Sequence, residues 1–286
     1  MYPAQFEYHT AGTVKEAVDL LAKYKDEAKL LAGGHSLLPA MKLRLAQPKH
    51  LIDIGKVSGL AGVKEEGGTL VIGAMTTHYA IESSAVLKSK CPLLPEVAGH
   101  IGDPMVRNMG TLGGSLAHAD PAADWPAAVI ALAAELVAEG PKGKRSIKVD
   151  DFFKGLLTTA LAEDEILTEI RVPACGANVK CAYAKFPHPA SRFAVVGVAA
   201  VLTMDGGKIS KASIGITGAG TKATRAKGVE AAIAGKPADA ASIQAAASSA
   251  AEGVDVQADL QGSVEYKQHL LRVFAKRAME AAAAKK

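Results

Sequence analysis

AGGHS at residues 32–36 and GTLGGS at residues 110–115 are the two stretches that decide how this chain folds and what it binds. Each holds a glycine pair followed at once by a serine, and the first lies between an expected strand and an expected helix. Glycine lets backbone amides approach a ligand closely, and free amides bind anions such as a diphosphate. One Gly-Gly pair alone most often marks a tight turn. Two such loops together predict that both expose amides and flank a single diphosphate.

The glycine loops do not match the common nucleotide motifs. Neither is G-x-G-x-x-G, so a Rossmann dinucleotide site is not indicated, and the chain has no G-x-x-x-x-G-K-[ST] loop. A third glycine-rich stretch, Gly218-Ala219-Gly220-Thr221-Lys222, follows an expected strand and is interpreted as a turn before a helix.

The composition is that of a globular protein. The 286 residues are 49% hydrophobic and 22% charged, with 33 Lys and Arg against 29 Asp and Glu, which gives a net charge of +4. These values exclude disordered, collagen-like and disulfide-scaffold classes. The length suggests two domains, or one domain with an added lobe. Because basic and acidic residues are interleaved without a basic stripe, nucleic-acid binding is not expected.

No membrane span, export signal or metal cluster is expected either. The longest apolar runs, residues 125–137 and 193–204, are shorter than the roughly 18 residues that a membrane-spanning helix needs. The first ten residues, MYPAQFEYHT, lack the features of a signal peptide, so a cytoplasmic location is predicted. Three cysteines, at positions 91, 175 and 181, are too few for a four-thiolate iron–sulfur site and are interpreted as ordinary thiols.

Strands and helices alternate in the first half of the chain. Thr13 and Glu16 form a capping box, which predicts a helix over 14–24. Strands are expected at 29–32, 51–54 and 69–73, with a helix at 37–45. Asp120, as the N-cap before Pro121, predicts a helix to residue 131, followed by a hairpin of 135–138 and 146–149. The residues after Pro173 are expected to form a separate lobe, with strands at 195–203 and 209–217 and helices at 223–233, 238–251 and 264–284.

Four ordered motifs carry a resemblance to a known family: AGGHSLLPAMKLR (32–44), VRNMGTLGGSLAHADPAADWP (106–126), the FF-x-G to DEILTEIRVP stretch (152–173) and YAKFPHPASRFAVVGVAA (183–200). The chain resembles the FAD-binding medium subunits of molybdenum hydroxylases, and among them those of carbon monoxide dehydrogenases. The resemblance runs from Phe6 to about Met279.

The resemblance implies an α+β fold with three parts. Residues 1–57 and 58–175 would be two subdomains that hold FAD between them, a PCMH-type arrangement. Residues 176–286 would form a C-terminal lobe with a three-stranded antiparallel sheet and a helical bundle. The elements expected from the residues alone agree with this arrangement.

The resemblance also implies a set of FAD-binding residues, and no catalytic residue or metal ligand on this chain. The diphosphate would lie on Ala32, Gly33, Gly34, His35, Ser36, Thr111, Gly113, Gly114 and Ser115. Asp124 is expected near ribose or adenine hydroxyls, Leu161 at the isoalloxazine through its backbone, and Lys185 at the carbonyl edge of the ring. His35 is interpreted as a hydrogen-bond donor to the diphosphate loop and not as a covalent flavin attachment.

Two residues depart from the family pattern, and one expected ligand has an ordinary alternative. Phe193 stands where related chains place a Tyr against the ring, so stacking is kept and the hydroxyl is lost. Met105 replaces a common Gln. A cation beside a reducible ring raises its potential, a role open to Lys185, whereas without the resemblance Lys185 would be an ordinary solvated lysine.

The function implied is electron transfer. The chain would take electrons from a small subunit with two two-iron clusters and pass them through FAD to an acceptor such as a quinone, in a dimer of heterotrimers with a large molybdenum subunit. Peripheral contact with a quinone-containing membrane is compatible with this role. Two alternatives stay open: a free-standing FAD-dependent reductase of related fold, and a non-catalytic interaction protein.

Overall fold

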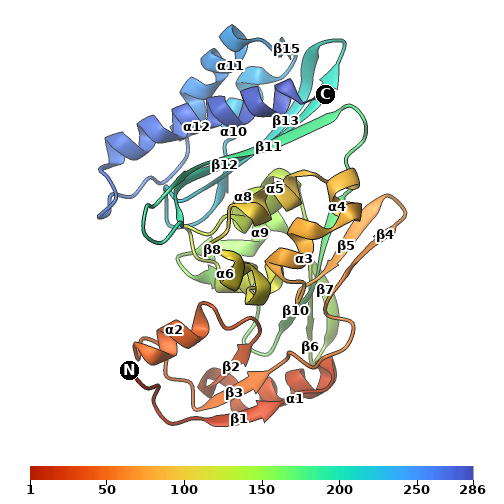
Figure 1. Cartoon of the computed structure of the whole chain (residues 1–286), viewed down its shortest axis with the longest axis vertical. Helices are drawn as coiled ribbons and strands as arrows, with labels where there is room; N and C mark the ends of the chain where they lie inside the picture. The colour runs from red at the N-terminus through yellow and green to blue at the C-terminus, as the bar shows by residue number, and fades with distance from the viewer. Residues whose placement is uncertain (286) are drawn as a thin grey trace.

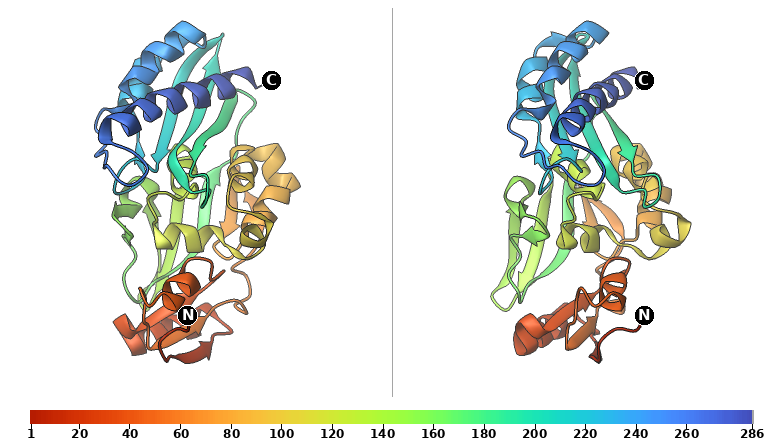
Figure 2. Two further views of the ribbon diagram at one scale, coloured as in Figure 1. Left: turned by 60° about the vertical axis from the view of Figure 1, so that its left-hand side comes forward. Right: turned by 90° about the vertical axis from the view of Figure 1, so that its left-hand side faces the viewer.

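A computed structural model describes residues 1–285, and its three main sheets follow one another along the length of the molecule (Figures 1 and 2). The first sheet is parallel, in the order β1 (Glu7–Thr10), β3 (His50–Asp53), β2 (Ala28–Leu31). Helix α1 (Val14–Tyr24) and the short 3-10 helix η1 (Lys25–Glu27) connect β1 to β2, and α2 (Leu37–Lys42) lies between β2 and β3. Helix α1 buries Ala17, Val18 and Leu21, the apolar stripe that its sequence predicts.

The second sheet is antiparallel and forms the middle of the molecule. Its order is β4 (Val63–Glu66), β5 (Thr69–Gly73), β10 (Ile166–Pro173), β6 (Glu135–Gly140), β7 (Gly143–Lys148). Its helices are α3 (His78–Ser83), α4 (Ala85–Lys90), α5 (Leu93–Gly99), α6 (Pro104–Met109), α7 (Leu112–His118), α8 (Trp125–Ala131) and α9 (Val149–Phe152). A two-stranded ribbon, β8 (Phe153–Gly155) and β9 (Thr158–Thr159), lies beside them.

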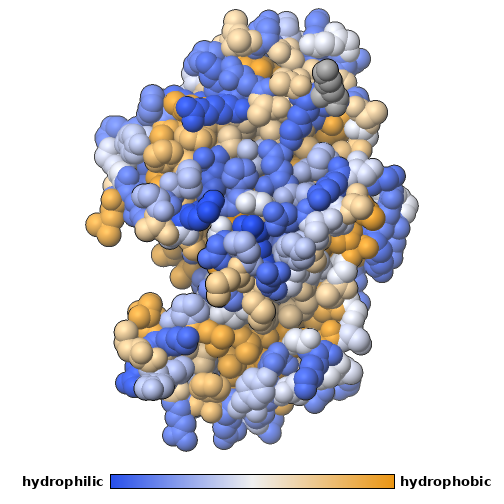
Figure 3. Space-filling model, in the orientation of Figure 1, coloured by the Kyte–Doolittle hydropathy of each residue, from blue (hydrophilic) through white to orange (hydrophobic). Residues whose placement is uncertain are grey.

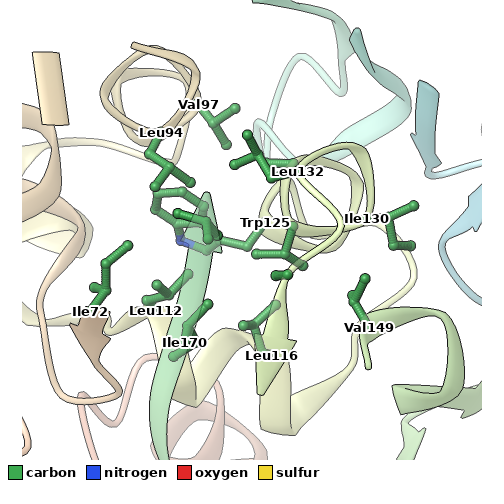
Figure 4. Close-up of a cluster of buried hydrophobic side chains, with 14 of the residues drawn as sticks. Ile72, Leu94, Val97, Leu112, Leu116, Trp125, Ile130, Leu132, Val149 and Ile170 are labelled. Carbon is green, nitrogen blue, oxygen red and sulfur yellow. The ribbon is translucent and has the colours of Figure 1, made fainter. Parts of the chain in front are cut away.

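Trp125 lies in the core that joins these helices to the middle sheet. The indole is fully buried, and Figure 4 shows it between side chains of the helices and of strands β5 and β10, among them Leu94, Leu112 and Ile170. Its polar edge is satisfied because Nε1 donates to Nδ1 of His78 at 3.0 Å. The core therefore fixes α7, the helix at the end of the second glycine loop, through Leu112 and Leu116.

The third sheet has three long antiparallel strands, β11 (Val179–Pro187), β12 (Ala194–Asp205) and β13 (Lys208–Thr217), extended by β14 (Thr224–Arg225) and β15 (Lys236–Pro237). One face is covered by α10 (Lys227–Ile233), α11 (Ala240–Ala247), the 3-10 helix η2 (Ser248–Ala251) and α12 (Val264–Ala284). The other face meets α8 so closely that a Cβ on Gly215 would lie 2.0 Å from the carbonyl oxygen of Ala127. Glycine at this position permits the contact.

The predicted α+β class is confirmed, and several expected elements fall on the predicted residues, among them α1, β5 and α12. Of the two hydrogen bonds that the predicted capping box requires, the structure contains one. Thr13 Oγ1 accepts from the amide of Glu16, whereas the Glu16 carboxylate accepts from Gly12 instead of the N-cap amide. Helix α2 ends three residues before the expected position, with Arg44 in the left-handed region.

Two expected helix starts are wrong. Residues 120–123 form a turn, in which Asp120 Oδ1 accepts from Ala122, and the helix begins only after Asp124. The carbonyl of Pro121 accepts from the Gly218 amide and the Thr217 hydroxyl, so contacts with the third sheet hold this segment out of the helix. In the same way residues 224–225 pair with β13 before α10 begins.

The three cysteines lie in one region although no sequence spacing links them. Cys91 and Cys181 are fully buried and Cys175 is partly buried against the same core. Contact with Cys181 lowers the pKa of Cys175, but contact with Cys91 and burial outweigh it and raise the value to about 12. Contact with Cys175 and burial also raise the pKa of Cys181. The Cys175 and Cys181 thiols are therefore protonated at neutral pH. Separately, none of the helices within residues 1–285 has the length and apolar character of a membrane span.

Candidate functional site

The first glycine loop, residues 32–36, connects β2 to α2 and leaves its amides unused. Within residues 1–285, no protein oxygen accepts from the backbone amides of residues 33–37. Gly34 has φ +74°, which a residue with a side chain rarely adopts. The carbonyl of Gly33 accepts from the His35 ring, whose Nδ1 lies 3.0 Å away, so this imidazole stays beside the loop. Five successive free donors are suited to an anion.

The second glycine loop, residues 110–115, is built differently from the sequence prediction. Most of its amides donate to other groups of the protein: Leu112 to Thr76 O, Gly113 to Ala74 O, and Gly114 to Thr111 Oγ1, at 3.0, 2.8 and 3.1 Å. The expectation that both loops expose free amides is therefore wrong for the second. Thr111 and Gly113 are buried, whereas Gly114 and Ser115 are partly exposed, so Gly114 and the Ser115 hydroxyl are the more accessible parts of this loop.

The structure brings the two loops into direct contact. A Cβ on Gly33 would lie 2.1 Å from Met109 O and 2.8 Å from Gly110 Cα, so only glycine permits this approach. A Cβ on Gly114 would lie 3.7 Å from Cβ of Ala32. Beside this contact the surface is hollowed between the part that carries α2 and the part that carries α6 (Figure 3; compare Figure 1). The notch gives a ligand access to both loops.

His78 supports the second loop from behind, and nothing in the sequence pointed to it. Its backbone amide donates to Gly110 O, and a Cβ on Gly110 would lie 2.6 Å from its Nε2. Burial lowers the pKa of His78 to about 4, so the ring is neutral at physiological pH. Nδ1 accepts from Trp125, which leaves the proton on Nε2. The loop thus rests on a side chain anchored in the core.

Asp124 and Lys185 form a second, buried cluster. Lys185 Nζ lies 2.9 Å from Asp124 Oδ2 and 3.1 Å from His100 O, and Tyr183 donates to Asp124 Oδ1 at 2.6 Å. The two charged side chains are 2% and 5% exposed, so neither is an ordinary surface group. Burial raises the pKa of Asp124, although Lys185 and Tyr183 act against it. The two residues that were expected at different parts of the ligand are here partners of one another.

The two remaining expected residues lie on separate loops. Leu161 follows β9, is partly buried against the core that contains α7, and donates its amide to the Thr159 hydroxyl. Phe193 ends the tight loop between β11 and β12 and is 43% exposed. It lines a cavity of about 180 Å³ together with Ala122 and Gly218, next to the segment that leads to Asp124.

Comparison with known proteins gives two family matches that cover most of the chain. Residues 4–175 match the FAD binding domain in molybdopterin dehydrogenase, and residues 181–282 match the CO dehydrogenase flavoprotein C-terminal domain.

Individual relatives extend over the full length. The carbon monoxide dehydrogenase medium chain of Hydrogenophaga pseudoflava is 44% identical over 99% of this chain and 98% of its own. Subunit alpha of the 6-hydroxypseudooxynicotine dehydrogenase complex of Paenarthrobacter nicotinovorans is 34% identical over 98% and 95%. A solved structure of the Hydrogenophaga pseudoflava carbon monoxide dehydrogenase has a chain that superposes with a TM-score of 0.97 at 46% identity, covering 99% of both chains.

Proposed function

Because the chain belongs to the FAD-binding medium subunits of the molybdenum hydroxylase family, we propose that it accepts electrons from an iron–sulfur subunit and passes them through FAD to an external acceptor. The observation that carries the proposal is the row of five free amides at residues 33–37, in contact with the second glycine loop. Such a cradle fits a diphosphate, the group that an FAD-binding domain must hold.

The two loops divide the work of holding the diphosphate. The first supplies amide donors from residues 33–37 and the Ser36 hydroxyl, with Ala32 and His35 at its sides. The second contributes the Thr111 and Ser115 hydroxyls. Gly114 adds no side chain beside Ala32, and Gly113 lets the loop pack closely on Ala74, where a Cβ would lie 2.4 Å from the Ala74 Cβ. Thr111 Oγ1 already accepts from Gly114, so its own proton is available to an acceptor. Both loops act as donors, which is the polarity that a dianionic ligand needs.

Lys185 is proposed to adjoin the isoalloxazine, whose chemistry when bound is reversible uptake of electrons. Asp124, predicted near ribose or adenine hydroxyls, is proposed to lie at the ring instead because its side chain contacts Lys185. An ammonium has three donors, and among residues 1–285 Lys185 uses two, toward Asp124 and His100. The third is left for a carbonyl of the ligand. Asp124 then holds this cation in place, and Phe193 and the Leu161 backbone complete the ring site.

The clusters that deliver the electrons are proposed to lie on a partner. Two of the three cysteines here are buried and one is partly buried, and two have raised pKa values, whereas a two-iron cluster needs four deprotonated ligands. We therefore assign the clusters to a small subunit, substrate oxidation to a large molybdenum subunit, and the whole to a cytoplasmic dimer of heterotrimers. A quinone is the proposed acceptor because the chain has no Rossmann fingerprint for NAD.

The FAD site is tested with Thr111→Val and a matched control. The change removes the Thr111 hydroxyl and the N-cap bond to Gly114, and we expect FAD affinity to fall about tenfold or more. Thr13→Val removes the equivalent N-cap bond to Glu16 far from the loops. It should cost the same roughly 1 kcal/mol of stability without altering FAD affinity. Equal FAD affinity in the two variants, measured by fluorescence titration, contradicts the site.

The electron route is tested on the native complex. Subunits that co-purify with the chain are identified by mass spectrometry, and iron and molybdenum are measured in the same preparation. Reduction of a soluble quinone and of NAD⁺ by the complex is then compared. Turnover of NADPH by the isolated chain identifies a free-standing reductase, and a colourless protein that releases no FAD in acid identifies an interaction protein. Either result overturns the proposal.

A further inference from the structure

Three potential metal ligands converge on the first sheet, away from both glycine loops. Glu7 and His9 alternate along β1, so their side chains lie on the same face, and His50 is the register partner of Glu7 on β3. His9 Nε2 lies 3.1 Å from His50 Nδ1, and Glu7 Oε2 lies 3.4 Å from His50 Nδ1 and 3.8 Å from His9 Nε2. Glu7 Oε2, His9 Nε2 and His50 Nδ1 therefore lie close enough together to bind one ion.

The separations match those of ligands on a single small cation. Two atoms bound tetrahedrally to Zn²⁺ at about 2.0–2.1 Å are about 3.3 Å apart. The three measured distances lie on either side of this value. Two imidazole nitrogens and one carboxylate oxygen form a donor set that Zn²⁺ accepts in proteins, and three protein ligands leave the fourth position to water.

The imidazoles are held in place before any ion arrives. The Tyr24 ring stacks on His50 with centroids 3.6 Å apart and planes 17° apart, and on His9 at 5.1 Å and 26°. The His50 and His9 side chains are 13% and 21% exposed, whereas Glu7 is 71% exposed. Two rigid ligands and one mobile carboxylate at the surface give an ion both a preformed site and a path of entry.

We propose that Glu7, His9 and His50 form a binding site for a divalent transition-metal ion, with Zn²⁺ as the preferred ion. The site is structural. His50 and Ala28 begin paired parallel strands, whereas the first glycine loop follows the other end of β2, so the ion lies at the opposite end of the sheet from the diphosphate cradle. The ion would join β1 to β3, and each of these strands is only four residues long.

The test uses full-length protein without a histidine tag, treated with chelator and titrated with Zn²⁺ by calorimetry. We expect one equivalent to bind and the thermal midpoint to rise. Co²⁺ in place of Zn²⁺ should give the intense visible absorption of a tetrahedral site. His50→Gln should weaken binding by about 100-fold or more, because changes outside the ligand shell already cost 10- to 100-fold. His269→Gln, at an exposed position on α12, is the matched control and should leave binding unchanged.

A second variant separates loss of the site from loss of folding. Glu7 is the most exposed ligand, so Glu7→Ala should preserve the far-ultraviolet circular dichroism while it weakens Zn²⁺ binding and alters the Co²⁺ spectrum. Absence of stoichiometric Zn²⁺ binding by the wild-type chain overturns the proposal. So does a Co²⁺ spectrum that Glu7→Ala and His50→Gln leave unchanged. Neither measurement depends on FAD, so the result is independent of the proposed function.

Discussion

Lys185 and Asp124 illustrate how burial and a charged neighbour shift the pKa of one carboxyl group in opposite directions. The Asp124 carboxyl is nearly fully buried, and burial raises its pKa above the ordinary value of 3.8. Folding therefore favours the protonated form, so the contribution of Asp124 to stability decreases as pH rises through this raised pKa. Lys185 opposes the shift by stabilising the carboxylate.

Lys185→Met should make the protein strongly sensitive to pH. Without the ammonium the Asp124 pKa rises further, and above it the carboxylate is buried without a cation, at a cost of about 3–5 kcal/mol in the free energy of unfolding. Urea unfolding of the FAD-free chain should show the full loss of unfolding free energy at about pH 8 and a smaller loss at about pH 5.5. The double variant Lys185→Met/Asp124→Asn should be insensitive to pH over this range. Equal losses for Lys185→Met at both pH values would refute the explanation.

Phe193 offers the converse case, a side chain whose change should affect the ligand and not the fold. It is 43% exposed at the end of a loop, so Phe193→Ala should alter the free energy of unfolding by less than about 1 kcal/mol. If the ring stacks on the flavin as proposed, the absorption spectrum of bound FAD shifts in this variant. Phe193→Tyr keeps an aromatic ring and should restore the spectrum. An identical spectrum in Phe193→Ala and wild type removes Phe193 from the site.

At the scale of elements, α8 and β13 join the middle of the molecule to the C-terminal lobe. Gly215→Ala would place a Cβ 2.0 Å from Ala127 O, so the helix and strand must separate. We expect a loss of about 1–3 kcal/mol, typical of overpacking, measured by thermal or urea unfolding. In the control Gly12→Ala the nearest atom is 3.6 Å away, and stability should change by about 0.5 kcal/mol or less. Similar stability of the two variants would show that this contact is not tight in solution.

The elements that could be predicted from sequence are those defined by local chemistry. Helix α1 has a capping hydroxyl and an apolar stripe, and β12 and β13 meet at an Asp-Gly-Gly turn. The start of α8 could not be predicted, because Asp120 is as good an N-cap as Asp124 and the choice is made by hydrogen bonds from β13 and the turn after it. The helices α3 to α6 were missed because each has only six or seven residues.

The same distinction applies to the candidate site. The glycine loops could be recognised because a glycine pair can be identified directly in the sequence. The structure shows that the two loops are in contact. Which loop keeps its amides free depends on Ala74 and Thr76, residues far from the second loop in sequence. The roles of His78 and of the Lys185–Asp124 pair likewise arise from contacts between distant segments. The residue types were therefore predictable, and their partners were not.

At the scale of the whole molecule, a ligand in the notch between the first two sheets should hold these parts together. FAD at 100 times its dissociation constant should stabilise the chain by about 2.7 kcal/mol, provided that the unfolded chain does not bind it. The thermal midpoint of FAD-free protein should therefore rise with FAD concentration, and cleavage by a protease near residues 54–62 should slow. A midpoint independent of FAD would show that the notch does not bind it.

The first sheet is completed by a residue from far along the chain. Its core combines Ile52, Ile54 and Leu60 with Ile166, which begins the central strand β10. During synthesis on the ribosome, α1 can cover part of this core early, whereas the position of Ile166 stays unfilled until β10 has also left the exit tunnel. We therefore expect the packing of the first sheet to be completed only late in synthesis, because of where this one isoleucine lies in the sequence.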